Sequence, residues 1–226
     1  MSEHKIQWSF SALKTFEQCP RKYYHTKIAG DVKDSPGTAA LYGLRFHEAA
    51  EHYGRDGKRL PSEFRHHQPL LDTLLGIEGD KYFELEMGIK KADNWYDPCE
   101  FNDEDRWFRC IADFVCVNGD VAHSVDYKTS KSARYADTRQ LDVVAAALFL
   151  KFPDLDTVKS GLLFTECKDF IKKTHYREHL ENYLKKFETP LYNLESCLET
   201  GVWNTKTSPL CGYCPVSQCE HHPDGG

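Results

Sequence analysis

Two apolar runs, 106–117 and 121–129, flank the dipeptide Asn118-Gly119. Asn-Gly between two such runs is the strongest short-range signal for a β-hairpin. We expect Asn118 and Gly119 to form the two-residue turn, so that residue 117 pairs with residue 120. This antiparallel pair is the clearest fixed element of the chain, and the other elements have to pack around it.

The expected register brings charged side chains together on one face of the hairpin. It sets Asp113 opposite Ser124, and positions two apart on a strand share a face, so Asp126 and Lys128 project to the same side as Asp113. The two carboxylates then become diagonal neighbours with Cβ atoms roughly 7 Å apart. Two carboxylates, a lysine and a divalent cation form a device for phosphodiester hydrolysis. The alternative is that they are ordinary solvent-facing residues of a hairpin.

The remaining segments predict a mixed architecture. Short helices are expected after Ser9 and from Pro20, longer helices over 38–53, 136–152 and 176–198, and further strands over 81–89 and 158–165. Strands covered by helices indicate an α/β or α+β fold. We expect one domain over 1–226, made of N-terminal helices at 9–30, a core at 38–165, a helix at 176–198 and a cysteine-rich tail at 208–222.

Composition narrows the class of protein. The net charge of −6 and the pI near 6.0 argue against a generic basic coat for nucleic acid. The N-terminus lacks the apolar run of a secretory signal, and the longest apolar stretch, 143–150, is too short to span a membrane. We therefore expect a cytoplasmic protein of a prokaryotic or virus-infected cell, without membrane contact and with mostly reduced thiols.

Nine cysteines are present, and three of them lie within nine residues near the C-terminus: Cys211, Cys214 and Cys219. Such spacing in an intracellular protein indicates a metal rather than disulfides. Zinc would take a fourth ligand from His221 or His222. An iron–sulfur cluster would need a fourth cysteine, for which Cys19 is the candidate. Spacing alone leaves zinc and iron–sulfur open.

His47 lies on the expected helix 38–53, on the same face as Leu44 and Glu51. A lone helical histidine is usually a core or surface residue. Its neutral imidazole could also bind a transition metal such as manganese.

Several short motifs follow one another in a characteristic order. The segment 11–23 reads S-x-L-x-x-F-x-x-C-P-x-x-Y, 43–47 reads G-x-x-x-H, 111–113 reads I-x-D, 125–129 reads V-D-Y-K-T, and Gln140 is followed by leucine. In this order they resemble the PD-(D/E)XK nuclease superfamily, RecB-type, in its iron–sulfur branch. That branch includes CRISPR-associated adaptation exonucleases, the AddB nuclease domain and phage exonucleases.

The resemblance implies a restriction-endonuclease-like core, with a mixed central sheet flanked by helices and a structural 4Fe–4S cluster that joins the N- and C-terminal segments. It implies a metal-dependent DNA exonuclease of recombination, repair or DNA processing. Mg²⁺ or Mn²⁺ would be bound by His47, Asp113, Asp126 and the Tyr127 carbonyl. Lys128 would assist the attack of water, and Gln140 would orient the lysine or the substrate. The cluster ligands would be Cys19, Cys211, Cys214 and Cys219.

Weaker candidates surround this set. They are Glu51 and Glu86 for metal support, Lys131, Arg134 and Arg139 for DNA phosphates, and Tyr23, Tyr24 and Trp107 for base stacking, although core packing is the simpler reading of the aromatics. One alternative is a non-catalytic DNA- or protein-binding module with a zinc tail. Another is a nuclease subunit beside a helicase or integrase-type partner. A homo-oligomer is also compatible with the sequence.

Overall fold

The computed structural model describes residues 6–92, 95–223 and 225. The chain forms two compact units. The central unit comprises Gly37–Lys186, and the terminal unit comprises Met1–Pro36 together with Phe187–Gly226.

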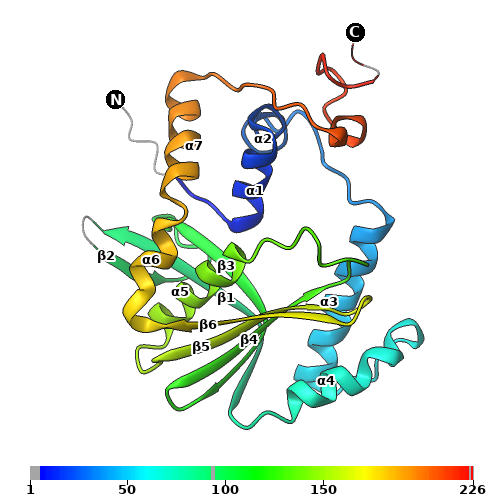
Figure 1. Ribbon diagram of the computed structural model, residues 1–226, viewed down its shortest axis with the longest axis vertical. Coiled ribbons are helices and arrows are strands. Elements are labelled where there is room, and N and C mark those ends of the chain that lie inside the picture. The colour runs from blue at the N-terminus through cyan, green and yellow to red at the C-terminus, as the bar shows by residue number, and fades with distance from the viewer. Residues whose placement is uncertain (1–5, 93–94, 224, 226) are drawn as a thin grey trace. The chain divides into compact units, whose positions relative to one another are not determined.

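The central unit is built on one mixed sheet (Figure 1). Its strands in the described part of the chain are β1 (Asp80–Ala92), β2 (Trp95–Cys99), β3 (Phe108–Asn118), β4 (Val121–Lys128), β5 (Thr157–Phe164) and β6 (Asp169–Tyr176). Their spatial order is β2-β1-β3-β4-β5-β6, and neighbours are antiparallel except for the parallel pair β4 and β5. A parallel pair needs a long crossover connection, and the helix α5 (Arg139–Lys151) lies in it. The expected mixed sheet with flanking helices is confirmed.

Helices pack on both faces of this sheet. Besides α5, the central unit contains α3 (Thr38–Asp56), the 3₁₀ helix η2 (Ser62–His67), α4 (Gln68–Leu75), the 3₁₀ turn η3 (Arg177–His179) and α6 (Leu180–Lys185). Leu163 packs with the cluster formed by α3 and α4, whereas its neighbours on β5, Leu162 and Phe164, pack with Leu141 of α5. Because side chains alternate along a strand, α5 covers the face opposite to α3 and α4.

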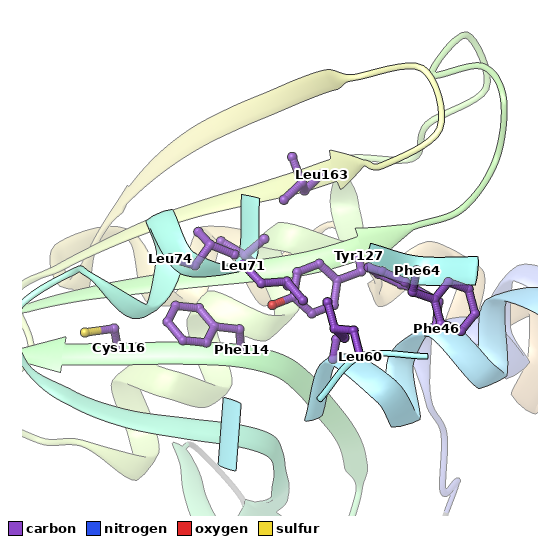
Figure 2. Close-up of a cluster of buried hydrophobic side chains, with 11 residues drawn as sticks. Phe46, Leu60, Phe64, Leu71, Leu74, Phe114, Cys116, Tyr127 and Leu163 are labelled. Carbon is purple, nitrogen blue, oxygen red and sulfur yellow. The ribbon is translucent and has the colours of Figure 1, made fainter. Parts of the chain in front are cut away.

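Phe46 anchors α3 to the sheet (Figure 2). Its side chain is fully buried, and its ring centroid lies 5.4 Å from Phe64, 5.0 Å from His67 and 5.6 Å from Tyr127. Rings at these separations and steep tilts add favourable edge-to-face contacts to the burial of apolar area. The packing holds the next residue, His47, against the end of β4.

The hairpin forms, but its register differs from the expected one by two residues. Asn118 pairs with Val121, so that Gly119 and Asp120 make the turn. Gly119 has φ 59°, and the first central position of a tight hairpin turn is where a positive φ favours glycine. The expected pairing of residues 117 and 120 is therefore wrong. The shift of two preserves which side chains share a face.

The single helix expected over 176–198 is also wrong, since this region contains the end of β6, the short helix α6, and then α7 (Glu188–Thr200). The proline at position 190 lies in the first turn of α7, where its missing N–H costs nothing. In the middle of a longer helix it would lose a hydrogen bond and clash with the preceding turn. The strands β2 and β6, which carry weaker apolar alternation, were not predicted from the sequence.

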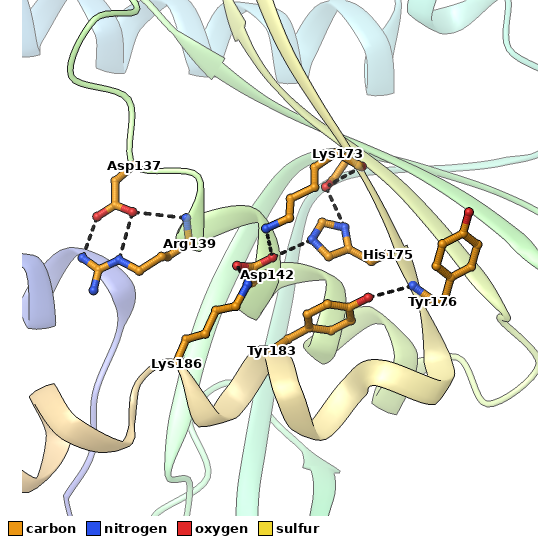
Figure 3. Close-up of polar contacts among 9 residues, drawn as sticks. Asp137, Arg139, Asp142, Lys173, His175, Tyr176, Tyr183 and Lys186 are labelled. Atoms are coloured by element: carbon orange, nitrogen blue, oxygen red, sulfur yellow. Dashed lines mark hydrogen bonds and ion pairs between the residues drawn. The ribbon is translucent and has the colours of Figure 1, made fainter.

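A buried charge network joins α5 to β6 and α6 (Figure 3). Asp142 on α5 is 1% exposed and accepts hydrogen bonds from Lys173 Nζ at 2.5 Å, His175 Nε2 at 2.9 Å and Lys186 Nζ at 2.7 Å. Burial alone would raise the pKa of Asp142, but these three donors hold it well below its usual range. Because Asp142 follows Gln140 by two residues, the network also fixes the part of α5 that carries Gln140.

The terminal unit brings the two ends of the chain together. It holds α1 (Phe10–Gln18), capped by Ser9, then α2 (Pro20–Tyr23), a π-helical turn over Tyr24–Ile28, α7 and the 3₁₀ turn η4 (Pro209–Tyr213). Trp8 lies 5.1 Å from Phe187 between ring centroids, and Tyr23 stacks on Trp203 at 6.1 Å. Arg21 Nε donates to the Trp203 carbonyl at 3.0 Å.

We predict that Phe46→Ala destabilises the protein by about 3–5 kcal/mol, because it removes a fully buried ring from the aromatic cluster. Leu44→Ala is the matched control on the same helix, since Leu44 is 62% exposed; its free energy of unfolding should change by less than about 0.5 kcal/mol. Urea unfolding followed by circular dichroism measures both. Equal losses in the two variants would contradict this role of Phe46.

Candidate active site

Three carboxylates lie in a row across three neighbouring strands. The pairing of β1 with β3 on either side of Glu84 sets that residue opposite Asp113. The register of β3 with β4, extended by one step beyond the pair Phe114–Val125, sets Asp113 opposite Asp126. We call Glu84, Asp113 and Asp126 the carboxylate row. The sequence-based register had made Asp113 and Asp126 diagonal neighbours, and the structure makes them direct ones.

His47 meets this row from α3. Its Nε2 lies 3.1 Å from the Tyr127 carbonyl oxygen, and its Nδ1 lies 3.3 Å from Asp113 Oδ2 and 4.0 Å from Glu84 Oε1. One ligand atom from each of His47, Glu84 and Asp113 lies within 4.8 Å of the other two. The imidazole and the two carboxylates thus converge in a space that one metal ion could fill, and the Tyr127 carbonyl contacts the other nitrogen of the same ring.

Gly43 lets α3 approach the sheet closely enough for this contact. A Cβ atom at position 43 would lie 2.9 Å from Thr129 Oγ1, just past the end of β4. Since Gly43 precedes His47 by four residues, both lie on the same face of the helix. A side chain at position 43 would therefore push α3 away from the sheet, and His47 would move away from the end of β4 with it.

Asp113 is held in place by the backbone of β4. It is 8% exposed, and its Oδ2 accepts a hydrogen bond from the Tyr127 N–H at 2.6 Å. The same residue, Tyr127, therefore positions Asp113 through its N–H and meets His47 through its carbonyl. The position between Asp126 and Lys128 contributes to the site through its backbone, while its side chain packs in the core.

Lys128, Gln140 and Asp126 form a closed triangle on the α5 side of the sheet. Lys128 Nζ donates to Gln140 Oε1 at 3.0 Å and lies 2.6 Å from Asp126 Oδ2, while Gln140 Nε2 donates to Asp126 Oδ1 at 2.5 Å. The amide of Gln140 fits between a cation and an anion because it offers one acceptor and one donor. The predicted metal ligands and catalytic residues thus lie in two neighbouring groups, His47 with Asp113 and the Tyr127 carbonyl, and Asp126 with Lys128 and Gln140.

Electrostatics in the carboxylate row favour a bound cation. Burial and the charge of Asp113 raise the pKa of Asp126 to about 6 and the pKa of Glu84 to about 7. Burial would lower the pKa of His47, but its hydrogen bond to Asp113 and the charges of the row outweigh it and raise that pKa. In the metal-free protein, protons bound by Asp126, Glu84 and His47 therefore relieve part of the repulsion among the carboxylates.

The donor set fits a divalent ion. Asp126 is only partly exposed, and the Lys128 ammonium, 2.6 Å from its Oδ2, is the cation that offsets its charge in the protein alone. An oxygen-rich site with one imidazole suits Mn²⁺ or Mg²⁺. A cation placed here would offset the charge of the crowded carboxylates.

Sequence reasoning missed Glu84. It named Glu86, which is exposed, and Glu51, which forms an ion pair with Arg55 at 2.5 Å. Glu84 and Glu86 are alike in strand alternation, so only the register against β3 distinguishes them. Glu84 also has φ 49° within its strand, an uncommon backbone conformation for a residue with a side chain. These two glutamates and Glu51 line one open groove along β1.

The candidate DNA contacts have different environments. Lys131 and Arg134 line an open pocket together with Lys168 of the β5–β6 turn, so three cationic side chains gather there. Arg139 is instead paired with Asp137 through its Nη2 at 2.7 Å and its Nε at 3.0 Å. Its charge is therefore largely compensated, and it is the weakest of the predicted phosphate contacts.

The candidate stacking residues pack against other aromatic rings. Tyr23 is buried and stacks on Trp203, whose centroid also lies 5.4 Å from Tyr24. Trp107 lies 5.1 Å from Tyr96 between ring centroids. Packing is thus their observed environment.

A family model, described as "PD-(D/E)XK nuclease superfamily", matches residues 7–219. The chain belongs to this superfamily. Membership implies phosphodiester hydrolysis with divalent metals such as Mg²⁺ or Mn²⁺, and a nuclease binds DNA. The carboxylate row and the lysine of V-D-Y-K-T lie within the matched residues.

One solved structure shows the same fold at low sequence identity, and a second is similar at a lower TM-score. A "Putative exonuclease" from Eubacterium rectale has a TM-score of 0.54 and 16% identity, over 95% of this chain and 91% of that one. SSO0001 has a TM-score of 0.42 and 13% identity, over 96% of this chain and 87% of that one. No curated protein matches the sequence. In the part of the PD-(D/E)XK chain that the structure describes, we find no helix with the length and apolarity needed to span a membrane.

We predict that Mn²⁺ binding strengthens as the pH rises through about 6 and 7, because the ion must displace the protons that burial and repulsion hold on Asp126 and Glu84. A raised carboxylate pKa stabilises the folded, metal-free protein below the ordinary pKa values of 3.8 and 4.5 and ceases to do so above the folded values. The stability of the metal-free protein should therefore fall over the range in which metal affinity rises.

Titration calorimetry at several pH values, in buffers of different ionisation enthalpy, measures the affinity and the released protons. Glu84→Gln should reduce the proton release near pH 7. An Mn²⁺ affinity that does not change between about pH 5 and pH 8 would contradict the prediction.

Proposed function

We propose that the protein is a metal-dependent DNA exonuclease of the RecB type, with a structural 4Fe–4S cluster in its terminal unit. The observation that carries the catalytic proposal is the contact of His47 with Asp113 and with the Tyr127 carbonyl, where Asp126 lies opposite Asp113 and Lys128 is held by Gln140 beside Asp126. The likeness to a structure named "Putative exonuclease" supports the exonuclease part of the proposal.

His47, Asp113, Asp126 and the Tyr127 carbonyl would hold the ion, with Glu84 as an additional carboxylate at the edge of the set. When bound, Mg²⁺ or Mn²⁺ polarises a phosphoryl oxygen and makes water a better nucleophile near neutral pH. Most of these ligand groups are positioned before substrate arrives, because the Tyr127 backbone fixes both Asp113 and His47. Preorganisation of this kind lowers the cost of reorganising charge during the reaction.

Lys128 offsets negative charge at the scissile phosphate. Its ammonium lies at the open end of β4, and its side chain is 34% exposed, so it can reach a bound phosphate. Gln140 keeps Lys128 beside Asp126 by accepting a hydrogen bond from its ammonium, while the Asp142 network holds the helix that carries Gln140. Gln140 is therefore a positioning residue in this proposal.

The substrate would approach over the cationic pocket beside the site. Lys131, Arg134 and Lys168 line this pocket, and the segment that carries Lys131 and Arg134 follows Lys128 directly. A local cluster of cations explains how a chain with a net charge of −6 can bind DNA. Binding should accordingly weaken with rising salt.

The cysteine arrangement supports the iron–sulfur branch. Cys19 and the tail residues Cys211, Cys214 and Cys219 line one pocket of about 230 Å³, and all four thiols are free. His221 and His222 line the same pocket, so the ligands of either metal are near one another there. Cys19 is the ligand that a four-cysteine cluster needs and a Cys3His zinc site of the tail does not, and its presence in the pocket supports the cluster. Thiols that remain reduced, as in the cytoplasm, are the form that either metal requires.

We predict that Lys128→Ala lowers the rate of DNA cleavage by at least about 100-fold, because it removes a cation from the transition state. Lys159→Ala is the matched control, since Lys159 is an exposed lysine of β5, and it should cleave at the parental rate. The assay follows 5′- and 3′-labelled single- and double-stranded DNA with Mn²⁺, and a circular DNA reports endonuclease action. Equal activity of the two variants would refute the catalytic assignment.

We predict that protein purified without oxygen is brown and contains about four iron and four sulfide per chain. Cys214→Ser should lose the visible absorbance, whereas Cys167→Ser should retain it, because Cys167 lies on the β5–β6 turn of the central unit. Metal analysis and the absorbance spectrum measure this. A colourless protein with bound zinc that is lost in Cys214→Ser and kept in Cys167→Ser would show the Cys3His alternative to be correct.

A further inference from the structure

A second group of possible metal ligands lies outside the carboxylate row. His66 and His67 end the 3₁₀ helix η2, and Glu166 follows β5, a hundred residues later in the chain. One ligand atom from each of the three lies within 4.8 Å of the other two. His66 is exposed, His67 is 5% exposed and Glu166 is half-buried.

The separations suit ligands of one ion. His67 Nε2 lies 3.2 Å from Glu166 Oε1, and the two histidine rings lie 3.8 Å apart between centroids. Metal–ligand bonds of about 2.0–2.2 Å in a tetrahedral site set two ligand atoms about 3.4 Å apart. A metal could therefore replace the proton shared by His67 and Glu166 with little movement of either side chain.

The surroundings of these side chains suit metal binding. His67 is buried and its Nε2 faces Glu166, so the ring nitrogen is directed at the carboxylate rather than at solvent. The Tyr42 hydroxyl donates to Glu166 Oε1 at 2.9 Å. A carboxylate ligand is commonly oriented by such a second hydrogen bond.

We propose that His66, His67 and Glu166 bind one transition-metal ion of the zinc class, with solvent completing its coordination. Two imidazoles and one carboxylate select zinc, cobalt or nickel over Mg²⁺, which prefers oxygen ligands. The exposed ring of His66 provides the entry path. This site is separate from the carboxylate row and from the cysteine pocket, because it shares no residue with either.

The ion would join η2 to the strand end beside the catalytic lysine. Thr165, the neighbour of Glu166, donates its N–H to the Lys128 carbonyl at 2.9 Å. The ring of His67 packs against Phe46, the neighbour of His47, at 5.0 Å between centroids. Metal binding would therefore brace both sides of the candidate active site, and its expected effect is a higher melting temperature rather than a chemical step.

The test compares zinc binding by the full-length protein, with its native tail metal in place, to that of three variants. His66→Gln and Glu166→Gln each remove one ligand, and His179→Gln removes an exposed histidine elsewhere in the central unit. Because the variants share every other ligand, zinc held by the cysteine pocket or the carboxylate row cancels in the comparison. Calorimetric titration with ZnCl2 and melting curves with and without zinc are the measurements.

We expect His66→Gln and Glu166→Gln to lose one zinc per chain, or to bind it more than about 100-fold more weakly, together with the zinc-dependent rise in melting temperature. The His179→Gln protein should behave as the parent does. Equal zinc stoichiometry and affinity in His66→Gln and the parent would overturn the proposal. Since the His66 side chain is exposed, this variant decides the question even where Glu166→Gln fails to fold. Mn²⁺-dependent DNA cleavage is a separate readout, so this result is independent of the nuclease proposal.

Discussion

Repulsion among three carboxylates is the constraint on which the rest of the central unit depends. Glu84, Asp113 and Asp126 lie side by side on three strands, and burial keeps water from screening them. Protons, the His47 ring and the Lys128 ammonium each relieve part of this repulsion in the protein alone. A divalent cation would relieve more of it at one point. The structure thus keeps three negative groups close together, an arrangement that a divalent metal ion stabilises best. This crowding is the physical reason to expect a metal ion in this member of the superfamily.

Each neighbouring element keeps these groups close together. The packing of Phe46 and the missing side chain of Gly43 bring His47 to the end of β4. The crossover between the parallel strands β4 and β5 carries α5 across the opposite face, where Gln140 bridges Lys128 and Asp126. The two faces of the sheet therefore supply different groups: one contributes the imidazole and the other contributes the lysine and its amide partner. Loss of the packing of α3 or of α5 on the sheet would therefore separate these groups from one another, although every side chain of the site would still be present.

The sequence predicted the local features and missed those that depend on distant pairing. Asn118-Gly119 predicted the hairpin, and strand alternation correctly set Asp113, Asp126 and Lys128 on one face even though the register was off by two. Glu84 could not be found, because its place opposite Asp113 depends on the pairing of β1 with β3, which no local pattern specifies. The helix over 176–198 was wrong because helical spacing alone did not reveal the break that precedes α7. The proximity of Cys19 to the tail is likewise a long-range property: cysteine counting made Cys19 a candidate, and only the resemblance to a family implied that it joins the tail residues.

The most direct test of the central claim is a crystal structure of the protein soaked with Mn²⁺, with an anomalous difference map calculated for manganese. The account predicts a peak bonded to His47, Asp113, Asp126 and the Tyr127 carbonyl, and loss of that peak in Asp126→Asn crystals. Strong manganese peaks elsewhere and none at the carboxylate row, in a protein that cleaves DNA with Mn²⁺, would contradict the account.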